Sequence, residues 1–445
     1  MSDILSISPL DNRYWNKINE LSDYFSEYAI IKSRFMVEIL YYEYLLKKLV
    51  CPNRENKNEL EKLITNFNVE DAFEIKEIEK TTNHDIKAIE YFIQKKEIIK
   101  YPNLVHFGLT SADVSSLAFT FNVKNAVNSV INLEIEKLLL ILSCSCNFWK
   151  NIPMLGKTHG QPASPTTLGK EMYVFYYRLN NQLNELNNTK FTTKFGGAVG
   201  NLNAHLVSYP NIKWDVELEK FVKSFGIERQ KYTTQIENYD DLSSLFNNLN
   251  RICVILIDLC RDIWLYISMN YFSLDVLKNE VGSSTMPHKV NPINFENAEG
   301  NLLLSSSLFN FFSNKLPISR LQRDLTDSTV SRNVGVAFGH LLLGLKSLIT
   351  GLKKIKPNEN EINRDLNENS IVLAEALQTL LRKDGINNAY DIIKNLTRGE
   401  NIKWKNLKNL LLQNNLENVS LSNESIKIIS DLDVNNYIGN SKKIN

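Results

Sequence analysis

Hydrophobic residues recur every three or four positions over much of this chain, and glycine and proline are absent from three long blocks of it. Strands are bounded by turns, so a protein of many strands would interrupt such blocks often. The blocks therefore predict long α-helices. They span residues 109–152, 170–195 and 227–281.

The third block has the clearest helical pattern, between residues 242 and 269. One apolar stripe advances by threes and fours, through Leu242, Leu245, Phe246, Leu249, Ile252, Cys253, Leu256, Leu259, Ile263 and Ile267. The opposite side is apolar as well, at Val254, Ile255, Ile257, Trp264 and Leu265. A helix that is apolar nearly all round is buried among other helices. We therefore expect the middle of a helical bundle, with the far side of this helix packed against other subunits.

Three regions differ in pattern, and together they predict an all-α protein. Residues 1–111 mix short helical patterns with polar turns, and residues 112–351 carry the long helices. Residues 352–445 turn polar at "KKIKPNENEINRDLNENS" and continue as a smaller helical region. We expect three mostly helical domains with these boundaries, the central one being the long-helix bundle.

Charge and composition exclude several classes of protein. Lys plus Arg is 51 and Asp plus Glu is 50, a balance that argues against a nucleic-acid partner. The start, "MSDILSISPLDNRYW", lacks a secretory signal, and the apolar stretch "ICVILIDLC" is too short to span a bilayer. The five cysteines have neither disulfide-framework nor zinc spacing. We expect a cytoplasmic protein without a membrane partner, whose cysteines are buried structural thiols.

Four polar islands interrupt the apolar periodicity, and they are the candidates for chemistry. They are "TTNHD" (81–85), "LTSAD" (109–113), "KTHGQPASP" (157–165) and "GSSTMPHKVNP" (282–292). Hydroxyls, amides and imidazoles dominate them, which suits binding an anionic substrate and moving a proton. No metal-ligand spacing is present, so we expect no metal.

Each island also has a structural explanation when it is taken alone. "TSAD" is a good helix N-cap series, and the fourth island could be a helix-capping loop. Three other histidines, His106, His205 and His340, are interpreted as hydrogen-bonded structural residues.

Taken together, the islands resemble a known family. "GSSTMPHKVNP" resembles the signature loop of the fumarase/aspartase superfamily of lyases, and "THGQPA" resembles its second block. Within that superfamily, "NRYW", "TTNHD", "QRDLTDSTVSRN" and "NPINFENAEGN" resemble the adenylosuccinate lyase family. The similarity runs from about residue 8 to "TRG" at 397–399. It implies three helical domains, the central one contributing to a shared helical core in a homotetramer.

The resemblance also implies an activity and a set of site residues. The family removes fumarate, without a cofactor, from adenylosuccinate to give AMP, and from a succinyl-carboxamide ribotide (SAICAR) to give the free carboxamide (AICAR). Motif by motif, His159 takes the role of general acid and Ser283 that of general base, on a loop that closes over substrate with Gly282 as hinge. The implied substrate-binding residues are Arg13, Tyr14, Asn83, His84, Asp85, Thr110, Ser111, Gln235, Ser284, Lys289, Val290, Asn291, Asn297, Arg323, Ser328, Thr329, Val330, Ser331 and Arg332.

Two alternatives stay open at this point. Another fumarate-releasing lyase, such as argininosuccinate lyase, would share the elimination chemistry but would not need the residues assigned to the phosphate. A catalytically silent scaffold would be expected to have lost His159, Ser283 or Lys289, and all three are present. The sequence also departs from the family after "TSAD", where Val114, Ser115 and Ser116 replace a common Asn.

Overall fold

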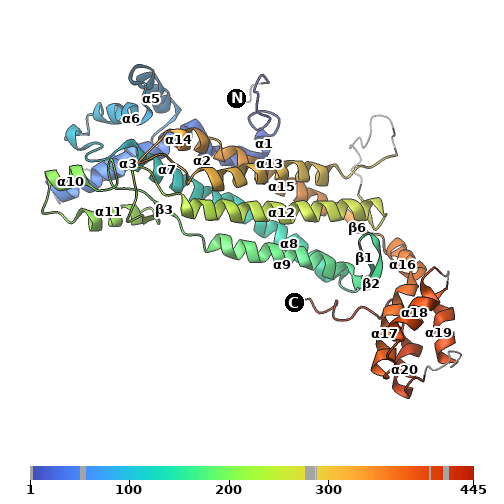
Figure 1. The fold of residues 1–445 in the computed structure, drawn as a ribbon. Helices are drawn as coiled ribbons and strands as arrows, with labels where there is room; N and C mark the ends of the chain where they lie inside the picture. Colours follow the sequence, from blue (N-terminus) through green and yellow to red (C-terminus); the bar gives the residue numbers. More distant parts are fainter. Residues whose placement is uncertain are drawn as a thin grey trace. The chain divides into compact units, whose positions relative to one another are not determined.

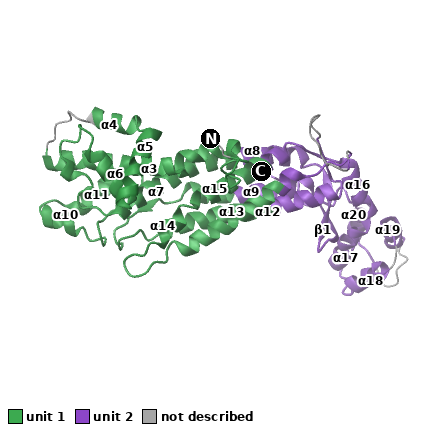
Figure 2. Cartoon of the chain, turned by 90° about the horizontal axis from the view of Figure 1, so that it is seen from above, with its two compact units in different colours: residues 1–136, 181–257, 297–347 green, residues 137–180, 258–296, 348–445 purple. Residues whose placement is uncertain are grey.

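The computed structural model describes residues 4–50, 57–275, 286, 288–399, 402–413 and 420–444. Within them the chain is mostly α-helical, with a few short strands (Figure 1). Contacts between Cα atoms group the chain into two compact units, coloured separately in Figure 2. Unit 1 consists of residues 1–136, 181–257 and 297–347, and unit 2 of residues 137–180, 258–296 and 348–445. This grouping follows contacts and not chain order, so the predicted boundaries at 111/112 and 351/352 stay a prediction.

Unit 1 holds the N-terminal helices and the segments around them. Its elements are α1 (Trp15–Ile18), η1 (Asn19–Leu21), α2 (Ser22–Phe25), α3 (Glu27–Leu45), η2 (Leu46–Val50), α4 (Lys57–Thr65), α5 (Val69–Thr82), α6 (Asp85–Gln94), η3 (Pro102–Leu104), α7 (Ser111–Ala126), η4 (Val127–Ile131), β3 (Thr192–Thr193), α10 (Asn203–Ser208), α11 (Trp214–Lys223), β4 (Glu228–Arg229) and α14 (Thr326–Ser331). Helix α3 lies at the centre, packed against α6 and α7. Phe35, Tyr41 and Phe92 are buried in that core, so α3 is a fixed support for any side chain it presents to a neighbouring pocket.

Unit 2 holds a hairpin and a C-terminal helical cluster. Its elements are β1 (Pro153–Thr158), β2 (Gln161–Thr167), β5 (Phe272–Leu274), β6 (Ile355–Pro357), α16 (Glu359–Glu368), η5 (Ser370–Leu373), α17 (Ala374–Lys383), α18 (Ala389–Thr397), α19 (Trp404–Leu412) and α20 (Asn423–Asp431). Strands β1 and β2 pair antiparallel, and so do β5 and β6. Leu377, Leu407 and Ile429 form the buried core of the cluster.

Five long helices contribute residues to both units, and the first three of them coincide with the blocks that predicted long helices. They are α8 (Asn132–Trp149), α9 (Leu168–Asn187), α12 (Asp240–Ser268), α13 (Ile293–Lys315) and α15 (Val334–Leu352). Within unit 1, the rings of Phe246 and Phe309 stack with centroids 5.8 Å apart, and Phe309 meets Phe338 edge-on at 5.4 Å. Three helices, α12, α13 and α15, therefore share one core.

The two sides of α12 differ more than the sequence predicted. Its apolar stripe is buried from Leu242 to Ile263, as predicted. On the opposite side Ile255 and Ile257 are also buried, but Val254, Trp264 and Leu265 are 42–51% exposed. One chain therefore covers only part of the second apolar side.

One other stretch resembles a membrane span by composition. Among the described residues, Thr326–Leu352 is long and apolar enough to cross a bilayer, and 72% of its most apolar window is buried inside the protein. A core helix of a bundle meets the same two criteria, because it too is apolar nearly all round.

Candidate active site

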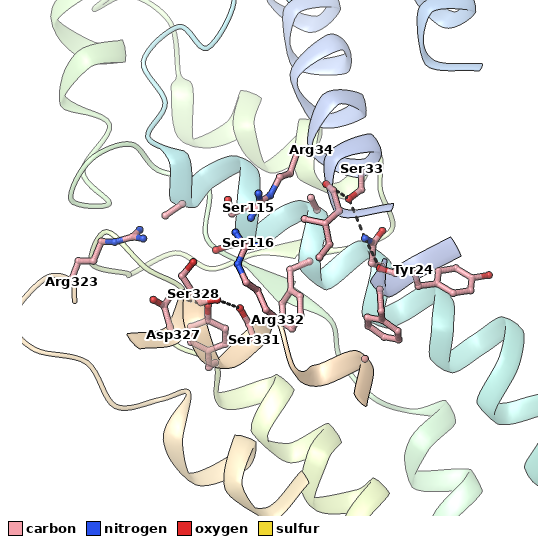
Figure 3. A pocket seen from close by; sticks show the side chains of 18 residues that line it. Tyr24, Ser33, Arg34, Ser115, Ser116, Arg323, Asp327, Ser328, Ser331 and Arg332 are labelled. Carbon is pink, nitrogen blue, oxygen red and sulfur yellow. Dashed lines mark hydrogen bonds between the residues drawn. The ribbon is translucent and has the colours of Figure 1, made fainter. Parts of the chain in front are cut away.

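Unit 1 contains a pocket between α3, α7 and α14, with about 790 Å³ of empty space that is partly open to solvent (Figure 3). Its floor is apolar and its walls carry hydroxyls and guanidinium groups. The lining residues that matter for binding are Arg34, Ser115, Ser116, Arg323, Asp327, Ser328, Ser331 and Arg332. A concave site with a few converging polar groups is typical of a small-molecule site, and three guanidinium groups favour an anion.

Arg332 follows α14 directly and is paired with two carboxylates. Its Nη1 lies 3.1 Å from Oε2 of Glu27, and its Nη2 lies 3.4 Å from Oδ2 of Asp85. Asp85 begins α6, and its Oδ1 accepts from the backbone N–H of Ile86 at 2.8 Å. The same Oδ2 also accepts from Nη1 of Arg34 at 2.7 Å. Asp85 and Arg332, predicted from separate motifs, are therefore brought into contact.

His84 and Ser111 are brought together in the same way. His84 caps α6, and its Nδ1 accepts from the backbone N–H of Lys87 at 3.1 Å. An acceptor nitrogen carries no proton, so Nε2 carries the ring proton of the neutral imidazole. That nitrogen lies 3.3 Å from Oγ of Ser111, to which it donates. Asn83, the residue before, ends α5 in the left-handed conformation with φ +51°. The island "TTNHD" is thus the junction between two helices.

A buried ion pair holds the second island in place. Asp113 and Lys194 are both fully buried, and Nζ of Lys194 lies 2.6 Å from Oδ1 of Asp113. The same carboxylate accepts from the backbone N–H groups of Thr110 at 2.8 Å and Gly196 at 2.6 Å. Burial lowers the pKa of Lys194, and the charge of Asp113 opposes that shift. The carboxylate therefore ties the start of α7, with Ser111, to the "FGGAVG" loop.

Asp327 presents an oxygen that the protein does not satisfy. It is 93% buried and lines the pocket. Tyr239 donates its hydroxyl to Oδ2 at 3.2 Å, whereas Oδ1 is buried and has no hydrogen-bond partner among the described residues. Burial, with the nearby charge of Asp327, raises the pKa of Tyr239 well above its ordinary value, so Tyr239 stays a donor. A buried acceptor without a partner is suited to a donor on the ligand.

The third island forms a β-hairpin, which the all-α interpretation did not include. β1 and β2 pair with Thr158 opposite Gln161, so the turn residues are His159 and Gly160. Both have positive φ, +52° and +71°, as a two-residue hairpin turn of type I′ requires. The His159 side chain is at the exposed tip and has no hydrogen-bond partner among the residues described. It belongs to unit 2 and does not line the pocket.

The fourth island can be described only in part. Ser283 and Ser284 lie outside the described residues, as does Gly282. Lys289 and Val290 are exposed, and Asn291 is half-buried. Asn297, on α13 in unit 1, accepts from the hydroxyl of Ser347 at 2.7 Å. The site roles of this island stay predictions.

Of the other predicted residues, some lie elsewhere in unit 1. The guanidinium of Arg13 lies 5.7 Å from the ring centre of Tyr14 and not in the pocket. The amide of Gln235 donates to the carbonyl of Ala198 at 3.0 Å. Thr329 and Val330 are on α14, but only their neighbours Ser328, Ser331 and Arg332 line the pocket. These assignments still rest on the resemblance.

The three structural histidines have partners inside unit 1. Tyr41 Oη lies 2.9 Å from Nε2 of His205, and burial lowers the pKa of His205 to about 4. His340 is 2.9 Å from Oδ1 of Asn301, and His106 is 2.5 Å from Oε1 of Glu38. These contacts agree with the structural interpretation. No cluster of three or more potential metal ligands occurs within the described part of the chain.

Comparisons with known proteins decide the family. Residues 13–303 match the family model described as Lyase, and residues 319–438 match the one described as Adenylosuccinate lyase C-terminal. The chain is 48% identical to an adenylosuccinate lyase of Dictyostelium discoideum, over 99% of this chain and 97% of that protein. The chain belongs to the adenylosuccinate lyase family. Identity to the Escherichia coli K12 member is 40%, over 99% of this chain and 97% of that one.

Solved structures support the fold of this adenylosuccinate lyase family member and nothing finer. A fumarate lyase from Mesorhizobium sp. BNC1 superimposes with a TM-score of 0.76 over 95% of this chain and 96% of its own, at 15% identity. A β-carboxy-cis,cis-muconate cycloisomerase from Acinetobacter calcoaceticus gives 0.73, over 97% of this chain and 98% of its own, at 15% identity. A cycloisomerase is not named for releasing fumarate, so the fold alone does not select the reaction.

Sequence reasoning missed several residues that line the pocket in this family member. Arg34 and Asp327 were given no role. Asp327 lies within "QRDLTDSTVSRN", beside the assigned Ser328, whereas Arg34 lies outside every motif that was singled out. An Arg on the apolar helix "EYAIIKSRFMVEILYYEYL" was the available signal for Arg34, since a cation in such a helix needs a partner. Ser115 and Ser116 had been noted only as departures from the family.

Proposed function

We propose that this protein cleaves adenylosuccinate to AMP and fumarate, and SAICAR to AICAR and fumarate, in purine nucleotide biosynthesis. The observation that carries the proposal is the 40–48% identity to adenylosuccinate lyases over nearly the whole chain. The pocket supports it, since Arg332, Arg323 and the α14 hydroxyls offer a phosphate cationic and neutral donors.

The proposed chemistry is a β-elimination that needs one base and one acid. Ser283, as alkoxide, takes the proton from the carbon beside a succinyl carboxylate, and the electron pair spreads into that carboxylate. The bond from the neighbouring carbon to nitrogen then breaks, which forms the double bond of fumarate. His159 gives its proton to the departing nitrogen. Donors held ready where charge develops, such as Thr110, Ser111, Lys289 and Asn291, stabilise the carbanion.

We propose further that each site is assembled from several copies in a homotetramer. Two observations support this. The described lining of the pocket comes from unit 1 alone, whereas His159 stands exposed on a hairpin of unit 2 and has no partner among the residues that the structure describes. The apolar side of α12 at Val254, Trp264 and Leu265 is also only partly covered by its own chain. Both features are expected of a chain that completes its site and core with neighbours.

Argininosuccinate lyase is the nearest alternative, and the pocket argues against it. Argininosuccinate carries no phosphate, so the cations Arg323 and Arg332 beside the hydroxyls of Ser328 and Ser331 would have no phosphate to bind. The curated relatives at 40–48% identity are named adenylosuccinate lyase.

The direct test is ultraviolet absorbance during incubation of the purified protein with adenylosuccinate, with AMP and fumarate identified as products. We expect the same rate after exhaustive chelation. Conversion of argininosuccinate and not of adenylosuccinate would overturn the substrate. Loss of activity with EDTA, restored by a divalent ion, would overturn the cofactor-free chemistry.

A further inference from the structure

Arg34 occupies a position that the proposed function does not yet use. It lies on α3, and its side chain extends into the pocket near Ser115 from above in Figure 3, whereas Arg332 approaches from below. Its side chain is only 12% exposed. A guanidinium that is so far removed from water needs a carboxylate partner, and Asp85 supplies it at 2.7 Å.

The two carboxylates that pair with Arg332, those of Asp85 and Glu27, each have a second cationic partner. Asp85 contacts Arg332 and Arg34, and Glu27 contacts Arg332 and Lys76, whose Nζ lies 3.2 Å from Oε1. Each carboxylate therefore touches Arg332 and one further cation. When Arg332 turns from the carboxylates to a phosphate, each of them still has a positive partner.

The two further cations, Lys76 and Arg34, differ in how far they are exposed to water, and therefore in how strongly each interacts with its carboxylate. Lys76 is 39% exposed and also pairs with Glu79 at 2.7 Å, so water and a second carboxylate screen it. Arg34 is only 12% exposed and points at the less exposed carboxylate, Asp85. Burial raises the pKa of Asp85, but Arg34, the Ile86 N–H and Arg332 lower it by more, so the group is held ionised.

We infer that Arg34 is a positioning residue that holds Asp85, so that Arg332 is free to bind the phosphate of the substrate. Without Arg34 the Asp85 carboxylate has Arg332 as its remaining guanidinium partner. It then competes with the phosphate for that side chain. The inference rests on the proposed function, because it assumes a phosphorylated substrate at Arg332.

The test is steady-state kinetics of Arg34→Ala with adenylosuccinate. Arg34 acts on binding in the ground and transition states alike, so KM should rise roughly tenfold to a hundredfold while kcat stays within about threefold. Arg34→Lys should recover most of the KM, because the contact to Asp85 is a single N–H···O bond that an ammonium can also make. Lys76→Ala should change KM by about threefold at most.

A double-mutant cycle separates this role from a structural one. On an Asp85→Asn background there is no carboxylate to neutralise, so adding Arg34→Ala should change KM no further. Arg364→Ala removes an exposed arginine that pairs with carboxylates on α16, and it should leave both constants unchanged. If Arg34→Ala does not fold, Arg34→Gln takes its place with the same expectations.

Three results would overturn the inference. They are an unchanged KM in Arg34→Ala, a loss confined to kcat, and full additivity with Asp85→Asn. Each of these requires a wild-type protein that cleaves adenylosuccinate. A wild type that does not cleave it contradicts the proposed function instead, so the two failures are distinguishable.

Discussion

The pocket around Arg332 and the hairpin around His159 are both polar, but they differ in the partners that their side chains find within the chain. Beside the pocket, Asp85 and Glu27 pair with Arg332, and Asp85 also pairs with Arg34, all within one chain. At the hairpin tip the His159 side chain has no partner among the described residues, and its backbone is held in a turn with φ +52°. The two-residue turn requires this positive φ, and it places the His159 side chain at the exposed tip.

In the proposed function, the pocket binds the substrate and the hairpin donates a proton, and this is how we interpret the difference between the two regions. Groups that hold an anion can be prepared in advance, since their charges are balanced by neighbouring carboxylates until the ligand arrives. A proton donor must meet the leaving atom of the substrate, and it does so from whichever element can reach it. We therefore expect changes in the pocket to act within one chain, and changes at the hairpin to act between chains.

The largest expected effect is at the two residues that we propose for proton transfer. His159→Ala and Ser283→Ala should each lower kcat by about 10²- to 10⁴-fold. After gentle dissociation and reassociation of the two variants at equal amounts, some sites draw an intact His159 from one copy and an intact Ser283 from another. Random assembly should restore roughly a quarter of wild-type activity.

Mixing each variant with itself is the control, and should restore nothing. The shared-site proposal fails if hybrids are shown to form, for example by native mass spectrometry, and the mixture stays as inactive as its parents. The comparison between pocket and hairpin would then lose its basis.

Next in size is the buried pair that supports Ser111. Lys194→Met leaves the fully buried Asp113 without its cation, and should destabilise the protein by about 3–5 kcal/mol. Denaturant unfolding measures this. Lys220→Met removes an ammonium that is 61% exposed and 3.1 Å from Glu217, and should shift stability by no more than about 1 kcal/mol. Equal effects of the two changes would show that the pocket wall is not held by this pair.

A smaller effect is expected at the phosphate. Arg332→Ala should raise KM for adenylosuccinate roughly tenfold to a hundredfold, because it loses charge-assisted bonds to the phosphate. The analogue without the 5′-phosphate should bind the variant and the wild type equally. Arg320→Ala is the control, since Arg320 is 81% exposed on the same segment. Equal losses for both ligands would contradict phosphate binding at Arg332.

The smallest expected effect is on the pH dependence of stability, and it arises from His106, in the loop before Thr110. Burial lowers the pKa of His106, but the Glu38 carboxylate raises it by more, so the net pKa is above 6.5. The stabilisation that the pair of His106 and Glu38 gives the folded protein is therefore complete below pH 6.5, and it is lost as the pH rises through the folded-state pKa of His106. In thermal unfolding, the Tm of the wild type should exceed that of His106→Gln by the largest amount at low pH.

His340 serves as a control because its pKa is shifted in the opposite direction. Burial lowers its pKa, so its contribution is present above the ordinary value of 6.5 and is lost as the pH falls towards the folded-state pKa. The difference in Tm between the wild type and His340→Gln should therefore become smaller at low pH. The same pH trend in both variants would contradict the ion pair between His106 and Glu38.

Much of the fold was predictable, because long helices leave a local record. The glycine- and proline-free blocks predicted α7, α9 and α12, and the stripe of α12 is buried as expected. The hairpin at His159 was not predicted. Its three prolines and its polar residues are typical of a loop, and only the pairing of β1 with β2 makes it a hairpin.

Sequence motifs alone determined the family and the candidate residues, because the islands are contiguous and chemically distinctive. Tertiary structure decided which of them meet. His84 reaches Ser111, and Asp85 reaches Arg332, across separations of 27 and 247 residues that no local pattern encodes. It also revealed Arg34, which sits within an apolar helix and becomes a pocket residue only when α3 packs beside α6 and α7. Side-chain partners are set by the packing of distant elements, whereas a motif carries only the order of its own residues.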